Sequence, residues 1–113
     1  MSEQIIKDIS AKGLKELIEK NKDNKDFVVI DCRTKGEFDM GHIKDSVLID
    51  FYNPSFMEEI GKLDKEKPYL IYCRTGSRSK VAMNLMERAG FREVYNMTYG
   101  VVEWYGDGFE LVK

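Results

Sequence analysis

The most restrictive feature of the sequence is an apolar segment that runs directly into a short polar loop. Residues 69–72 form an uninterrupted apolar run, and residues 73–79 follow with arginine, glycine and small polar side chains. Helical spacing of apolar residues begins immediately afterwards, at Val81, Ala82, Leu85, Met86 and Ala89. The order strand, tight loop, helix is typical of proteins in which helices cover a parallel sheet.

The same alternation recurs along the rest of the chain. Short apolar runs at residues 5–6, 27–30, 47–49 and 94–95 predict further strands. Apolar residues at helical spacing predict a helix after Ser10, a suitable N-cap, and a second helix from about residue 54 to 61. We therefore expect an α/β fold with a mostly parallel central sheet flanked by helices. Residues 99–113 show no clear pattern.

Length and charge limit the number of domains and the kinds of partner that the chain can have. A chain of 113 residues is the size of one domain, so residues 1–113 are expected to form a single domain. Its 18 basic and 20 acidic residues give a net charge of -2, which argues against a nucleic-acid partner. No apolar run is long enough to cross a membrane, and no apolar leader follows Met1, so no membrane partner and a cytoplasmic location are expected.

The two cysteines, Cys32 and Cys73, are either packed hydrophobic residues or reactive thiols. They lie 41 positions apart, and His42 is the single histidine, so no zinc-binding spacing is present and no metal is expected. A reducing compartment would keep both as free thiols. Their immediate neighbours decide between the two roles.

The loop after Cys73 has the composition of an anion-binding turn. A short loop that leads into a helix directs backbone N–H groups and the helix dipole at one point, and Arg74 and Arg78 add positive charge. Both effects favour a thiolate at Cys73 and an anionic group attached to it. Gly76 permits the tight turn, while Thr75, Ser77 and Ser79 either donate hydrogen bonds to the sulfur or cap the helix. The competing interpretation is a packed cysteine in an ordinary connection.

Several segments, in order, resemble the rhodanese domain of sulfurtransferases. The loop of residues 73–79 resembles the active-site loop of that family, and Asp31 and Arg33 resemble its Asp-x-Arg at a strand end. Further matches are Glu37-Phe38, Gly41-His42-Ile43, Ser46, Gly90-Phe91, Val94, Gly100 and Trp104. The resemblance spans about residues 27–104 and implies the rhodanese-like three-layer fold.

The resemblance implies sulfur transfer in two steps. Cys73 takes the outer sulfur from a small anionic donor such as thiosulfate, carries it as a covalent persulfide without any other cofactor, and gives it to a nucleophile. Arg74, Thr75, Gly76, Ser77, Arg78 and Ser79 would bind the anion, and a protein thiol or persulfide is a second candidate partner. Cys73 and Arg78 are separated by four residues, whereas related phosphatases and arsenate reductases have five. Such a phosphatase or reductase, and a non-catalytic sulfur-carrier or binding module, are the alternatives.

Four residues outside the loop are expected to have structural roles. His42 is expected to fix a turn by bonding to backbone, and Asp31 and Arg33 to pair and orient loops. Cys32 is expected to pack beside them, with a resolving role that closes a disulfide onto Cys73 as the alternative. The family has two adjacent glycines where this chain has Tyr99 and Gly100. If the first glycine requires a left-handed backbone, Tyr99 must change the path of the loop.

Overall fold

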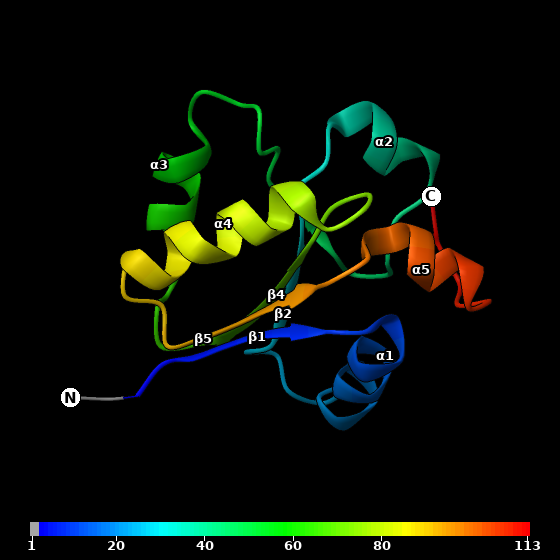
Figure 1. Ribbon diagram of the computed structural model, residues 1–113, viewed down its shortest axis with the longest axis horizontal. Helices are drawn as coiled ribbons and strands as arrows, with labels where there is room; N and C mark the ends of the chain where they lie inside the picture. Colours follow the sequence, from blue (N-terminus) through cyan, green and yellow to red (C-terminus); the bar gives the residue numbers. More distant parts are fainter. Residues whose placement is uncertain (1–2) are drawn as a thin grey trace.

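A five-stranded parallel sheet forms the centre of the protein in the computed structural model, which describes residues 3–113 (Figure 1). The strands lie in the spatial order β1-β5-β4-β2-β3, and every pair is parallel. Their bounds are β1 (Ile5–Ile9), β2 (Val28–Asp31), β3 (Val47–Leu48), β4 (Pro68–Tyr72) and β5 (Glu93–Met97). β4, which leads into the cysteine loop, is therefore a central strand.

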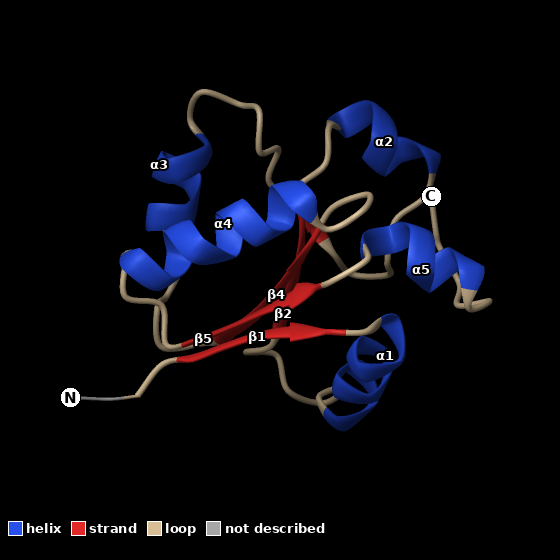
Figure 2. Ribbon diagram, in the orientation of Figure 1, coloured by secondary structure: helices blue, strands red, loops and turns tan. Residues whose placement is uncertain are grey.

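Helices cover both faces of the sheet, which gives three layers (Figure 2). The helices are α1 (Ala11–Lys20), α2 (Lys35–Met40), α3 (Phe56–Gly61), α4 (Ser77–Arg88) and α5 (Gly100–Gly106). α3 and α4 pack on one face, and α1 and α5 on the other. No helix within residues 3–113 is both long and apolar enough to span a bilayer.

Successive side chains of the central strands point to opposite faces of the sheet and so contribute alternately to two apolar cores. In β4, Tyr69 and Ile71 face α3 and α4, whereas Leu70 and Tyr72 face α1 and α5. All four side chains are nearly or fully buried. The continuous apolar run is thus explained by a strand that is covered on both faces, as expected for a parallel sheet.

The expected α/β class and parallel sheet are confirmed, but two short helices were not predicted. α2 begins with a capping box, in which Thr34 Oγ1 accepts from the backbone N–H of Glu37 and the Glu37 carboxylate accepts from the backbone N–H of Thr34. A Thr-x-x-Glu sequence is a known start signal, so this helix was predictable. α5 has only seven residues and lies in the segment without a clear pattern.

α5 is positioned by direct contact with the cysteine loop. The backbone N–H of Val101 donates to the Cys73 carbonyl (2.9 Å), and that of Val102 donates to the Arg74 carbonyl (3.1 Å). This close approach requires a glycine at position 100, where φ is +67° and a Cβ would overlap the carbonyl group of Arg74. The loop after β4 and the start of α5 therefore form one packed unit.

We expect Gly100→Ala to lower the free energy of unfolding by at least about 2 kcal/mol, because it combines a strained backbone angle with a steric clash. Gly36→Ala is the matched control: it lies in α2 with no atom within 4 Å of an added Cβ. The control should be neutral or slightly stabilising. Urea unfolding of both variants measures the difference, and equal stabilities would contradict the proposed constraint at position 100.

Candidate active site

Cys73 is the first residue after β4 and lies under the loop that leads into α4. The turn depends on Gly76, whose φ is +101° and whose hypothetical Cβ would overlap the Thr98 carbonyl oxygen. Thr98 directly follows β5. A glycine is therefore needed both for the backbone angle and for the close contact between the loop and the end of the neighbouring strand.

Three donors from the loop converge on the Cys73 sulfur. The backbone N–H of Gly76 lies 3.1 Å from Sγ, the backbone N–H of Ser79 lies at 3.5 Å, and Ser79 Oγ at 3.4 Å. The start of α4 adds its partial positive charge at the same place. Donors of this kind stabilise a thiolate or another anion on the sulfur.

The pKa of the Cys73 thiol is lowered to about 4. The largest cause is a hydrogen bond from the Cys32 thiol; burial opposes it, and the bonds from Ser79 and Gly76 add to it. The Cys32 thiol has its pKa raised strongly, chiefly because it donates to Cys73 and also because it is buried. The pair thus consists of a thiolate at Cys73 and a neutral thiol at Cys32 at neutral pH.

A chain of hydrogen bonds connects Ser79 to the surface. Ser79 Oγ donates to Asn96 Oδ1 (2.5 Å), Asn96 Nδ2 donates to Asp8 (3.0 Å), and Lys80 Nζ donates to the same carboxylate (2.7 Å). Ser79 and Asn96 are buried. The chain fixes the Ser79 side chain beside the sulfur, although its single hydroxyl proton is shared among Asn96, the Gly76 carbonyl oxygen and Cys73.

Arg78 is not the free cation that the sequence predicts. Both terminal nitrogens of its guanidinium donate to the Glu37 carboxylate, at 2.9 and 3.0 Å, and the group lies over the ring of Tyr52. The Arg78 bond lowers the pKa of Glu37 to about 2. This bidentate pair connects α4 to α2 beside the cysteine loop.

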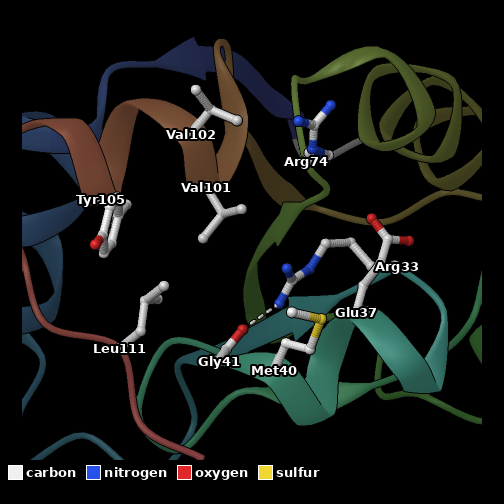
Figure 3. A pocket seen from close by; sticks show the side chains of 9 residues that line it. All are labelled: Arg33, Glu37, Met40, Gly41, Arg74, Val101, Val102, Tyr105 and Leu111. Carbon is white, nitrogen blue, oxygen red and sulfur yellow. Dashed lines mark hydrogen bonds between the residues drawn. The ribbon is translucent and has the colours of Figure 1, made fainter.

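Arg74 is the loop arginine without a salt bridge among residues 3–113, and its side chain is exposed. It lies at the edge of a pocket of about 440 Å³ between α2 and α5 (Figure 3). The other pocket walls are largely apolar, from Met40, Val101, Val102, Tyr105 and Leu111. Cys73 does not line this pocket, and its side chain is fully buried.

Asp31 and Arg33 form a buried ion pair at the end of β2. Arg33 Nη2 lies 2.7 Å from Asp31 Oδ2 and donates also to the Gly41 carbonyl (2.7 Å; Figure 3), while Tyr72 Oη donates to Asp31 (2.7 Å). His42 Nδ1 lies 3.0 Å from the Phe38 carbonyl oxygen. These contacts tie the ends of β2 and β4 to the segment after α2, and none of them reaches the sulfur.

Thr75, Ser77 and Tyr99 lie on the outer side of the loop. The side chains of Thr75 and Ser77 are exposed, and α4 has no side-chain cap. Ser79 is therefore the hydroxyl residue that reaches the sulfur. Tyr99 has a φ of −107°, an angle open to any residue, so the backbone at this position does not need a glycine. The requirement for glycine falls on Gly100 alone.

Sequence reasoning missed Glu37, Asn96 and Asp8 as members of the site. Glu37 belongs to a segment that the resemblance includes, but its pairing with Arg78 joins residues 41 positions apart. Asn96 is a buried polar residue in β5, and Asp8 lies in β1, which no local pattern connects to the loop.

Within residues 3–113, no group of three or more His, Cys, Asp or Glu residues could hold a metal ion.

The ultraviolet absorbance of the Cys73 thiolate should appear with a midpoint near pH 4, where the charge on Cys73 changes. Because this pKa lies below that of an unfolded thiol (~8.5), the thiolate stabilises the fold fully above the unfolded value, and the contribution is lost as pH falls through about 4. Titration of the protein against Cys73→Ser isolates the signal. A midpoint near that of free cysteine would contradict the site geometry.

Ser79→Ala should raise this midpoint, because it removes the hydroxyl that lies 3.4 Å from the sulfur. Ser77→Ala is the matched control, since Ser77 is exposed in the same helical turn. The same absorbance titration measures both variants. Equal midpoints for the two would show that the Ser79 hydroxyl does not stabilise the thiolate.

Comparison with known proteins agrees with this architecture. The family model described as the rhodanese-like domain matches residues 10–107. A protein named sulfurtransferase from Allochromatium vinosum is 32% identical over 91 residues, which cover 80% of this chain and 82% of that protein. A crystal structure of a rhodanese-related protein from Thermoplasma volcanium superimposes with a TM-score of 0.79 at 26% identity, covering 94% of this chain and 97% of that one.

A third relative is longer than this chain. A protein named tRNA uridine(34) hydroxylase from Pseudarthrobacter chlorophenolicus is 40% identical over 103 residues, which cover 86% of this chain but 34% of that protein. The chain thus spans about a third of the length of this relative. The family match covers most of the chain, and the sulfurtransferase is matched over most of both lengths. The protein belongs to the family of rhodanese-like domains.

Proposed function

We propose that the protein is a sulfurtransferase that carries a sulfane sulfur on Cys73. The main support for this proposal is the surroundings of the Cys73 sulfur. The pKa of the thiol is lowered to about 4, and three donors of the loop point at the sulfur. A thiolate at neutral pH needs no general base before it attacks. Donors that stabilise a thiolate are also suited to stabilise the negative charge of a persulfide on the same residue.

In the first step, the Cys73 thiolate attacks the outer sulfur of an anionic donor such as thiosulfate. The S–S bond of the donor breaks, sulfite leaves with the bonding electron pair, and a persulfide remains on Cys73. In the second step, a nucleophilic acceptor such as a thiolate takes the outer sulfur, and Cys73 leaves as a thiolate. The pKa of about 4 makes Cys73 a good leaving group for this second step.

Two arginines of the loop have different roles in this proposal. Arg74 is exposed beside the pocket between α2 and α5, so its charge is available to attract an anionic donor. Arg78 is paired with Glu37, and we assign it to holding α2 against the loop beside the sulfur. Because the Cys73 side chain is fully buried, a donor reaches the sulfur only when nearby side chains move.

The relatives named tRNA uridine(34) hydroxylase do not change this proposal. The activity in that name belongs to proteins of which this chain spans about a third. The relative matched over most of its own length carries the name sulfurtransferase. A phosphatase on the same fold is disfavoured by the four residues between Cys73 and Arg78, one fewer than in the phosphatases that the loop resembles.

Incubation with thiosulfate should add the mass of one sulfur atom to the intact protein. The adduct should be absent from Cys73→Ser, and an added reducing thiol should remove it from the parent protein. Intact-mass spectrometry checks both expectations. Absence of both the adduct and released sulfite, or an adduct that persists in the Cys73→Ser variant, would refute the proposed function. Robust hydrolysis of an aryl phosphate would favour the phosphatase instead.

Arg78→Ala should lower kcat/KM for thiosulfate by about tenfold or more, because a charge-assisted pair beside the reacting sulfur is lost. Arg88→Ala is the control, since Arg88 is exposed at the other end of α4. Steady-state kinetics of the parent and both variants gives the comparison. If the two variants have equal kcat/KM, Arg78 has no role in turnover.

A further inference from the structure

Cys32 is a buried thiol that forms no covalent bond in the sulfur transfer described above. It is the residue after β2, just as Cys73 is the residue after β4. The two strands pair in parallel with Asp31 opposite Tyr72, and the backbone N–H of Cys32 donates to the Tyr72 carbonyl (2.9 Å). The pairing therefore continues past the strand ends and sets the two cysteines opposite each other.

Both cysteine side chains also point to the same face of the sheet. Ile30 and Ile71 lie opposite each other and contribute to the apolar core under α4. Two residues further along each strand direction, Cys32 and Cys73 return to that face, and both are fully buried in the same core. The spacing of paired strands, about 4.8 Å, falls within the roughly 4.4–6.8 Å between Cα atoms that a disulfide needs.

We propose that Cys32 is a resolving thiol, which attacks the inner sulfur of the Cys73 persulfide, releases hydrogen sulfide and leaves a Cys32–Cys73 disulfide. This inference rests on the proposed function, because the persulfide is its substrate. It adds a second outcome for the bound sulfur, which leaves as free sulfide instead of passing to an external acceptor. The sequence favoured packing for Cys32, because it follows a strand and the resembling family often has an aliphatic residue there, and it left the disulfide with Cys73 as the alternative.

The step balances without an external oxidant. The Cys32 sulfur forms a bond to Cys73 Sγ while the bond from Sγ to the outer sulfur breaks. The outer sulfur leaves as hydrosulfide with that electron pair and takes up the proton of the Cys32 thiol. The two cysteines are oxidised to the disulfide and the sulfane sulfur is reduced to sulfide. An external dithiol then reduces the disulfide and restores both thiols.

The change of charge on Cys73 favours this attack only after sulfur has been bound. In the resting protein, the main reason that the pKa of Cys32 is high is its hydrogen bond to the Cys73 thiolate. In the persulfide, the negative charge lies on the outer sulfur, so the inner sulfur no longer holds the Cys32 proton as strongly. Attack on the inner sulfur instead of the outer one follows from position, because the pairing of β2 with β4 sets Cys32 directly opposite Cys73.

The test follows the persulfide after the donor has been removed. The protein is loaded with thiosulfate, separated from it, and kept without oxygen or added thiol. We expect the sulfur adduct to disappear, one sulfide to be released for each adduct lost, and the product to be two hydrogen atoms lighter than the reduced protein. Peptide mapping without reduction should then find Cys32 joined to Cys73.

Cys32→Ser is the matched control, because its hydroxyl still donates a hydrogen bond but forms no disulfide; Cys32→Ala is the second variant should the serine disturb folding. Both should retain the adduct at least about tenfold longer than the parent protein. An adduct that decays equally in all three, or moves to Cys32, overturns the inference. An adduct that persists in the parent without a disulfide overturns this inference alone, whereas failure to form any adduct in the parent and in both Cys32 variants refutes the proposed function and this step with it.

Discussion

The arrangement around Cys73 depends on backbone N–H groups that converge on one sulfur atom. Gly76 and Ser79 can direct their N–H groups at Sγ only because the loop turns sharply between β4 and α4. Gly76 permits the turn against Thr98, and Gly100 permits α5 to approach the same loop from the other side. Two left-handed glycines that are 24 positions apart in the sequence therefore hold the anion site together.

The electrostatics of the site come mainly from hydrogen bonds and dipoles rather than from free cations. Arg78 is paired with Glu37, and Lys80 with Asp8, so two of the three basic residues in the loop region are compensated. The leading causes of the low pKa of Cys73 are donors from Cys32, Ser79 and Gly76. A chain of net charge -2 can therefore hold an anion, because oriented hydrogen-bond donors stabilise it. The uncompensated Arg74 lies at the edge of the pocket between α2 and α5.

Much of the fold and the centre of the site could be predicted because their signals are local. The apolar run before Cys73 indicates a doubly covered strand, and β4 is one. Non-local pairing could not be read in this way: the bonds of Arg78 to Glu37 and of Asn96 to Asp8 join distant segments. The same limit applied to Cys32, whose proximity to Cys73 follows from the register of β2 and β4. Local sequence therefore identified the reactive residue and the donors of its own loop, but not the distant residues that pair with Arg78 and Asn96.

The central claim is that the loop holds a sulfur-bearing anion on Cys73. A crystal structure of the protein after treatment with thiosulfate tests it most directly. The account predicts one additional sulfur bonded to Cys73 Sγ, within hydrogen-bond distance of loop N–H groups. A Cys73 side chain with neither an extra sulfur nor a bond to Cys32 after such treatment, or an extra sulfur pointing away from the loop, would contradict the account.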